Sequence, residues 1–176
     1  MKNLLLIFII QLSLFAGSLE LERGHIKAHT EMLLDTTIDP INKSLMADLT
    51  MAGSDIESLR GRIWVDLNMF MSDMSERDAH MYDALESKKF ILATFIIDSV
   101  RKTEGADRYE IKGKLDFHGV QKELKSIATI SLLNKQLSFN ATATLNMSDY
   151  GIEMPCMMFM CVEEEVNLLV DAIFSK

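Results

Sequence analysis

Cysteine and proline are scarce in this chain of 176 residues, which has two of each. Two cysteines, Cys156 and Cys161, cannot supply the disulfide framework on which small secreted domains rely. The fold must therefore rest on an apolar core, and the chain is long enough to bury one within a single domain.

Basic residues are outnumbered and dispersed. The sequence has 18 Lys and Arg against 26 Asp and Glu, which gives a formal net charge of −8, and the basic residues form no cluster. Contacts to nucleic-acid phosphates need a basic surface. The composition therefore argues against a nucleic-acid partner.

Apolar runs long enough to span a bilayer are also missing. The uncharged, Leu- and Ile-rich segment 4–17 is shorter than the roughly 20 residues that a membrane helix needs. It follows a basic start at Lys2 and closes with the small residues Ala16 and Ser18, an arrangement typical of a secretory signal peptide.

We therefore predict a signal peptide at residues 1–18, with cleavage after Ala16 as the alternative. The remaining chain, residues 19–176, is predicted to be one periplasmic domain with no transmembrane segment after signal cleavage. No cysteine follows the apolar run directly, which argues against a lipoprotein.

Most of the remaining chain alternates apolar with polar residues, which is the pattern of half-buried β-strands. The alternation shifts phase near Gly24, where a glycine suits a β-bulge. The apolar positions include Ile26, Ala28, Thr30 and Met32, then Ile63, Val65, Leu67 and Met69, and further sets within residues 95–97, 111–117, 124–132, 137–145 and 166–172.

Short connections separate these segments. Gly53-Ser54, residues 104–107 and Asn134-Lys135 carry turn-forming residues. About eight strands joined in this way predict an all-β fold, an antiparallel barrel whose interior can hold one elongated ligand.

One segment has a helical pattern instead. Ser75-Glu76-Arg77-Asp78 has the spacing of a capping box with Ser75 as the N-cap, and Met81 and Leu85 follow one turn apart. We predict a helix over residues 76–88, beside or across one barrel opening.

Three separated blocks resemble the signature blocks of the YceI-like family, whose members are periplasmic, lipocalin-like barrels that bind polyisoprenoids and related amphipathic lipids. They are Glu76-Arg77-Asp78-Ala79-His80-Met81, Gly113-Lys114-Leu115-Asp116-Phe117-His118-Gly119-Val120 and Met147-Ser148-Asp149-Tyr150-Gly151-Ile152. The resemblance extends from about His25 to the C-terminus. One departure is Phe90-Ile91, which stands where the family commonly has an aromatic residue followed by proline.

The resemblance implies that Arg77 and His80 lie at the barrel mouth and hydrogen-bond a lipid head group. From the residues alone, another interpretation is equally open, in which Asp78 caps the helix while Arg77 and His80 are ordinary surface residues.

We expect a binding protein that holds an elongated amphipathic lipid, such as a polyisoprenoid, an isoprenoid quinone or a fatty-acid derivative, in an apolar tunnel for transport, storage or protection. Burial contributes about 0.8 kcal/mol per methylene, so affinity would come mainly from chain length. The sequence does not decide between a monomer and a homodimer. The predicted ligand-binding residues, drawn from the apolar strand faces and the first block, are Leu67, Arg77, His80, Phe95, Phe117, Ile130, Phe139 and Ala141.

The same alternation would also describe a barrel filled by its own side chains. Ala128, Ala141 and Ala143 favour an open interior because they are small.

The segment 156–161 offers an alternative function. Its thiol and thioether groups are the soft ligands that select Cu(I), so Cys156, Met157, Met160 and Cys161 form a candidate copper site. A simpler interpretation is that the 13 methionines line an adaptable apolar cavity. A Cys156–Cys161 disulfide is a third option and needs a turn, because an extended strand would separate the two Cα atoms by roughly 16 Å.

No Ser/His/Asp, Gly-x-Ser-x-Gly or metal-ligand pattern is present, so we expect neither an enzyme nor a cofactor. His25 and His29 would stand roughly 13 Å apart on a strand, too far to share one metal ion. His118 precedes a glycine at a turn and is interpreted as a structural hydrogen-bonding residue.

Overall fold

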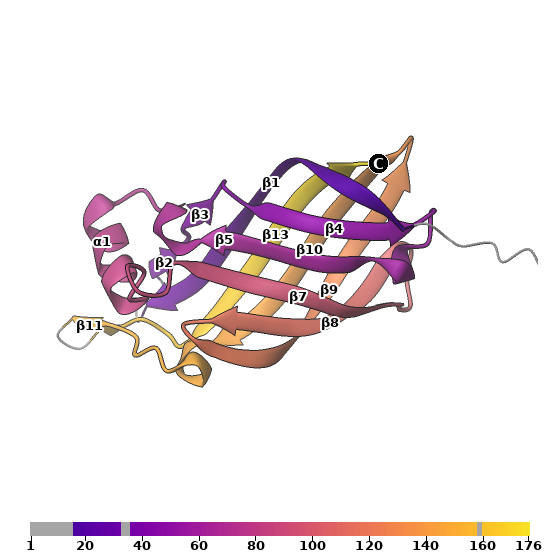
Figure 1. Cartoon of the computed structure of the whole chain (residues 1–176). Coiled ribbons are helices and arrows are strands. Elements are labelled where there is room, and N and C mark those ends of the chain that lie inside the picture. The colour runs from indigo at the N-terminus through magenta and orange to yellow at the C-terminus, as the bar shows by residue number, and fades with distance from the viewer. Residues whose placement is uncertain (1–15, 33–35, 158–159) are drawn as a thin grey trace, which may run out of the picture.

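Eight long antiparallel strands form a closed barrel (Figure 1). The computed structural model describes residues 16–32, 36–157 and 160–176, so most of the predicted signal peptide lies outside the described residues. The barrel strands are β1 (Ala16–Met32), β4 (Met46–Ala52), β5 (Arg60–Asp66), β7 (Leu92–Lys102), β8 (Arg108–Phe117), β9 (Val120–Leu133), β10 (Gln136–Asn146) and β13 (Glu165–Ser175).

Each of these strands pairs with the next along the chain, and β13 returns to pair with β1. The predicted antiparallel barrel of about eight strands is therefore confirmed. Because of this closure, each of the eight strands has a hydrogen-bonded neighbour on both sides, so none is an edge strand along its whole length.

The alternating sequence decides which side chains enter the barrel, because successive Cβ atoms point to opposite faces of a strand. In β8, Tyr109, Ile111, Leu115 and Phe117 are buried, while the polar residues between them are exposed or half-buried. The other barrel strands contribute further inward apolar residues to one continuous core.

Two tight hairpins connect strands at opposite ends of the barrel. Asn134 and Lys135 join β9 to β10 with φ values of 50° and 67°, as expected from the sequence. His118 and Gly119 join β8 to β9 with φ values of 53° and 75°. Both turns use consecutive left-handed residues, which match the twist of paired antiparallel strands.

The expected irregularity near Gly24 is present. The pairing of β1 with β13 shifts register between Leu21 and Arg23, next to this glycine. A Cβ atom on Gly24 would lie 2.8 Å from Cδ2 of Leu45, so the leucine side chain packs closely over this glycine.

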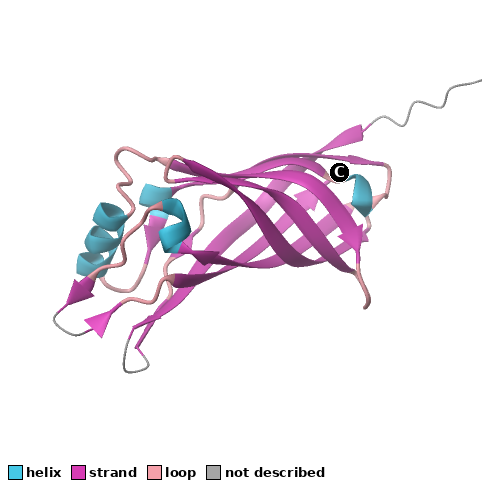
Figure 2. Cartoon of the chain, turned by 90° about the horizontal axis from the view of Figure 1, so that it is seen from below, coloured by secondary structure: helices cyan, strands magenta, loops and turns pink. Residues whose placement is uncertain are grey.

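Most of the smaller elements gather at one end of the barrel, which we call the helix end (Figures 1 and 2). The exception is the 3-10 turn η1 (Ile56–Ser58), which connects β4 to β5 at the other end. The C-terminus lies at the opposite end, called the far end. The elements of the helix end are α1 (Ser75–Ala84), β2 (Thr36–Ile38), β3 (Ile41–Asn42), β6 (Phe70–Met71), β11 (Cys156–Met157), β12 (Met160–Cys161) and the 3-10 turns η2 (Leu67–Met69) and η3 (Met147–Tyr150). Within the described ranges, no helix has the length and apolar content to cross a membrane.

The predicted helix exists but its ends and its cap were wrong. Met74 is the N-cap and makes no side-chain cap bond, so Ser75 already lies inside the first turn. Asp78 instead accepts a hydrogen bond from the backbone N–H of Ser72 at 2.8 Å. The helix ends at Ala84 because Leu85 caps it and Glu86 follows with a φ of 43°.

The alternation predicted through Met69 also ends earlier, at Asp66. The Asp66 side chain accepts a hydrogen bond from the backbone N–H of Asn68 and so caps the start of the turn η2. Leu67 stays buried while Met69 is exposed.

Candidate functional site

An apolar pocket of about 670 Å³ occupies the half of the barrel next to the helix end. Its deep wall includes Ile111 and Phe139, and its outer wall includes α1 together with Pro155 and Cys156. Inward residues of β1, namely Ile26, Ala28, Thr30 and Met32, also line it, as their alternation predicted.

Most of the residues predicted to contact the ligand lie on this pocket. Those on its wall are Leu67, Phe95, Phe117, Phe139 and Ala141, and Arg77 and His80 line it from α1. Ile130 is the exception, because it is fully buried and does not line the pocket. It stands near the far end of β9, where core side chains fill the barrel.

The filled far end makes the space a pocket closed at one end and not a tunnel. Large buried side chains that do not line the pocket occupy this part of the barrel, namely Leu19, Leu49, Met51, Leu59, Val100, Ile130, Leu137 and Phe174. Phe139, on the pocket wall, meets Phe174 edge to face with ring centroids 6.5 Å apart. Of the three small residues expected to leave space, Ala141 and Ala143 line the pocket and Ala128 does not.

Two buried hydroxyl groups on the pocket wall are occupied by internal hydrogen bonds. The buried Thr30 hydroxyl donates to the backbone oxygen of Glu165 at 3.0 Å. The buried Ser126 hydroxyl donates to the backbone oxygen of Thr142 at 2.8 Å. Since these donors are already used, the inner wall presents an apolar surface to whatever enters.

Methionines contribute to this wall. Met32, Met74, Met81, Met147 and Met154 line the pocket, and their unbranched thioether side chains can adapt to flexible occupants. Met69 and Met71 do not line it and are exposed at the helix end.

Helix α1 places charged groups at the opening. Arg77 Nη1 lies 3.4 Å from Oδ1 of Asp73, and Nη2 lies 3.1 Å from the Met74 sulfur. His80 is exposed, and Glu76 and Asp78 line the same region. The opening therefore carries both positive and negative side chains, so it is not a purely basic site for an anion.

A tyrosine hydroxyl anchors helix α1 to β6. The Tyr82 hydroxyl donates to the backbone oxygen of Phe70 at 2.5 Å. Burial, and secondly the charge of Asp78, raises the pKa of Tyr82, so the hydroxyl remains a donor.

The second and third sequence blocks meet at the helix end. His118 Nδ1 lies 3.0 Å from the backbone oxygen of Tyr150, and its ring lies 4.2 Å from that of Phe90. Its Nε2 is 3.0 Å from a Glu86 carboxylate oxygen but makes no hydrogen bond to it. His118 thus joins three loops, which fits the structural role expected from the sequence.

Tyr150 completes this junction. It is buried, its ring lies 5.3 Å from that of Phe117, and Gly151 follows in the left-handed conformation. Burial, and secondly the charge of Asp149, raises the pKa of Tyr150.

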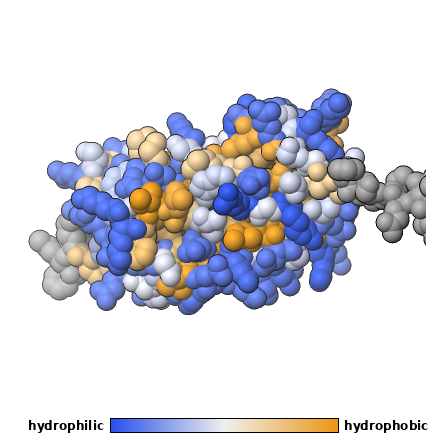
Figure 3. All heavy atoms as spheres, in the orientation of Figure 1, coloured by the Kyte–Doolittle hydropathy of each residue, from blue (hydrophilic) through white to orange (hydrophobic). Residues whose placement is uncertain are grey.

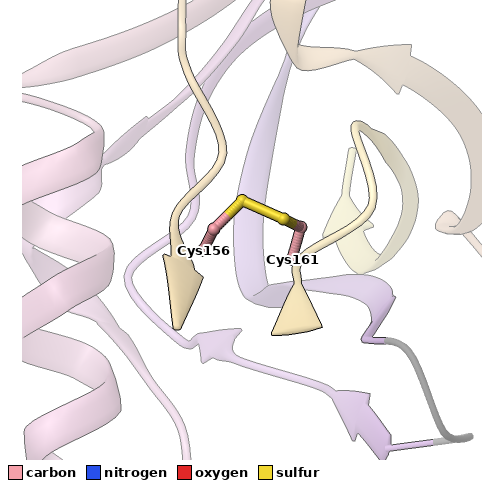
Figure 4. The surroundings of a disulfide bond; sticks show 2 residues. All are labelled: Cys156 and Cys161. Atoms are coloured by element: carbon pink, nitrogen blue, oxygen red, sulfur yellow. A yellow bond between two sulfur atoms is a disulfide. The ribbon is translucent and has the colours of Figure 1, made fainter. Parts of the chain in front are cut away.

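The two cysteines form a disulfide across the β11–β12 hairpin (Figure 4). The chain turns between them and brings their Cα atoms to 4.0 Å, as the disulfide option required. The bridge removes both thiolates from the candidate copper site, whose other proposed ligands, Met157 and Met160, have side chains outside the described ones. Over residues 16–32, 36–157 and 160–176, no three His, Cys, Asp or Glu side chains are grouped to hold a metal ion.

His25 and His29 each face a separate carboxylate on the outside of β1. His25 Nε2 lies 3.3 Å from Asp171, and His29 Nδ1 lies 2.7 Å from Asp39. Lys27 Nζ also lies 3.1 Å from Asp39. The Asp39 carboxylate thus joins the loop before β3 to the outer face of β1.

The pKa of Asp39 is lowered in the folded protein. Burial acts to raise it, but hydrogen bonds and charges from His29 and Lys27 outweigh that effect. The folded state then binds fewer protons than the unfolded state, so this cluster stabilises the fold above the usual pKa of 3.8 and loses that effect as the pH falls through the lowered value.

We expect Asp39→Asn to lower the free energy of unfolding at neutral pH by at most about 1 kcal/mol, because the cluster is partly solvated. The difference from wild type should disappear in strongly acidic solution. Urea unfolding at several pH values measures it, and a difference independent of pH would contradict the assignment.

The outer surface seen in Figure 3 is mostly hydrophilic, with separate apolar patches. This agrees with the outward polar residues of the alternating strands.

Comparison with known proteins identifies the same architecture. The YceI-like domain matches residues 19–174 of this chain. A UPF0312 protein of Pseudomonas putida is 38% identical over 104 residues, which covers 53% of this chain and 54% of that protein. The matched region thus spans about half the length of the curated relatives.

Solved structures share the fold at low identity. BcnA of Burkholderia cenocepacia has a TM-score of 0.75 at 14% identity and covers 85% of this chain and 95% of its own. A polyisoprenoid binding domain from Saccharophagus degradans has a TM-score of 0.68 at 12% identity. The match covers 90% of this chain and 97% of that domain. Because the domain match spans nearly the whole described barrel, the chain belongs to the YceI-like family.

Proposed function

We propose that this protein holds one elongated amphipathic lipid in the barrel pocket and does not alter it. Isoprenoid chains are the first candidates, since a fold neighbour is a polyisoprenoid binding domain. Quinones and fatty-acid derivatives have the same apolar chain chemistry. The signal-like segment at residues 1–18 adds the proposal that binding takes place in the periplasm and serves transport, storage or protection.

The observation that carries this proposal is the apolar pocket, which is closed at its far end. Its inner polar groups are already hydrogen-bonded, so it offers an occupant contact area and few polar partners. A pocket of this kind favours a hydrocarbon chain over a polar metabolite.

The volume limits the length of that chain. A methylene group takes about the space of a water molecule, roughly 30 Å³ in the liquid, so a pocket of about 670 Å³ holds about 20 carbons. That corresponds to about four isoprene units. A longer tail would have to leave its remainder outside.

Native mass spectrometry with a series of prenyl alcohols tests both statements. We expect 1:1 complexes whose affinity rises from geraniol to farnesol to geranylgeraniol by more than about tenfold per unit, since each buried methylene contributes about 0.8 kcal/mol. Solanesol, which is much longer, should bind no more tightly than geranylgeraniol.

Glycerol and a short alcohol serve as negative controls for non-specific adducts. Absence of a complex with every prenyl alcohol would refute the proposed function. A solanesol complex far tighter than the geranylgeraniol complex would show instead that the filled far end opens to longer chains.

A further inference from the structure

The barrel wall has a gap between β9 and β10 near the helix end. Their ladder runs from Gln136–Leu133 to Thr142–Ile127 and stops there. Beyond it, β10 continues to pair with β13 as far as Asn146, and β9 continues to pair with β8 as far as Val120. The two strands therefore do not pair with each other over residues 143–146 of β10 and 120–126 of β9.

The gap has defined edges. At its inner edge the Ser126 hydroxyl donates to the Thr142 backbone oxygen at 2.8 Å, replacing a ladder bond. At the rim, Lys122 Nζ lies 2.6 Å from Oδ1 of Asp149 and so links the start of β9 to η3. The result is a window in the side of the barrel and not a slit open to its end.

A groove of about 470 Å³ lies over this window on the outer surface. Ser126, Thr142, Ala143 and Leu168 line both the groove and the inner pocket. The two spaces therefore adjoin through the wall.

The lining of the groove carries one positive charge, that of Lys125, and no negative charge. Lys125 makes no ion pair with any residue the structure describes. The Oδ1 atom of Asn167 accepts a hydrogen bond from the Thr144 hydroxyl at 2.7 Å. The Nδ2 group of Asn167 is therefore free to donate to a ligand. An ammonium and an amide N–H together suit an anionic group.

We propose that the groove over the β9–β10 window holds the anionic head group of the bound lipid, a carboxylate or a phosphate ester, while its chain passes between the strands into the apolar pocket. This rests on the proposed function and names where the polar end lies. It moves the head group away from the opening at α1, where Glu76 and Asp78 stand beside Arg77. Ile127 and Leu169, which are partly exposed on the groove wall, would contact the first carbons of the chain.

Competition binding with farnesyl monophosphate and farnesol tests the proposal, because the two probes differ only at the head. Lys125→Glu is expected to weaken farnesyl monophosphate at least tenfold and to leave farnesol within about twofold of wild type, since only the charged head meets Lys125. Lys125→Arg should retain phosphate binding. Lys102→Glu, an equal charge change on exposed residue 102 at the far end, should affect neither probe.

A local probe gives a second readout. The native cysteines are bridged, so a thiol-reactive fluorophore labels only an introduced cysteine. A label at Thr144→Cys should change its emission when farnesyl monophosphate binds, whereas one at Thr129→Cys, on the fully paired outer wall, should not.

The outcomes separate the two proposals. If neither probe binds the wild type, the proposed function fails. If both bind and Lys125→Glu leaves farnesyl monophosphate binding unchanged, the groove proposal is overturned. If Arg77→Glu also weakens farnesyl monophosphate, the head group lies at the α1 opening instead.

Discussion

Replacing Ala141 by phenylalanine is expected to abolish lipid retention while leaving the barrel folded. Ala141 is buried on β10 and its methyl group lines the pocket. A benzyl group there would project into empty space, so it displaces ligand rather than core side chains. The cost of overpacking is therefore avoided.

The expected loss of affinity is large. Excluding about four methylenes of the chain would cost about 3 kcal/mol, which is more than about 100-fold in Kd. Displacement of a bound prenyl alcohol measures the affinity, and circular dichroism with thermal unfolding measures the fold.

Asn140→Phe is the matched control for this variant. It adds the same ring one residue earlier on β10, where the side chain is exposed outside the barrel. Binding should stay at the wild-type level in this control. Wild-type affinity in Ala141→Phe would mean that the lipid does not pass this part of the pocket.

The second large effect is expected at Gly61, where alanine should strongly destabilise the folded barrel. Gly61 pairs with Leu49 across β4 and β5 and has a φ of 126°, which L residues do not adopt readily. A Cβ atom there would lie 2.0 Å from the backbone oxygen of Asp48. Because that neighbour is backbone, relief requires the two strands to separate.

We expect Gly61→Ala to lower the free energy of unfolding by about 4 kcal/mol or more, within the range of the most severe single substitutions. Chemical unfolding followed by Trp64 fluorescence measures it. Gly53→Ala is the control, since Gly53 has a φ of 52° with no atom near the added Cβ and should cost only about 1–2 kcal/mol. Equal losses in the two variants would show that backbone conformation, and not the contact with Asp48, sets the cost at Gly61.

Local features were predicted with uneven success, and the reasons differ. Ser75 and Asp78 had the spacing of a capping box, yet Asp78 bonds the N–H of Ser72 and the helix starts one residue earlier than that box requires. Capping depends on the path of the preceding loop, which tertiary contacts set. The Asn134-Lys135 turn was predictable because the two residues that form it are adjacent and their conformation is local.

Within the site, the strand faces were predictable and the extent of the cavity was not. Phe139 and Ile130 are partners across β9 and β10, and both are buried. Only Phe139 borders the empty space, because side chains from several other strands fill the barrel around Ile130. No pattern in one strand reports that difference.

By itself, the sequence determined the barrel, its inward residues and the family, because strand periodicity fixes which Cβ atoms share a face and the three blocks are local. Only the tertiary structure decided that half of the barrel is filled, that Cys156 and Cys161 meet, and that the β9–β10 ladder ends at Thr142. Each of these depends on the spatial fit between groups that different turns and strands bring together, and a one-dimensional pattern does not record that fit.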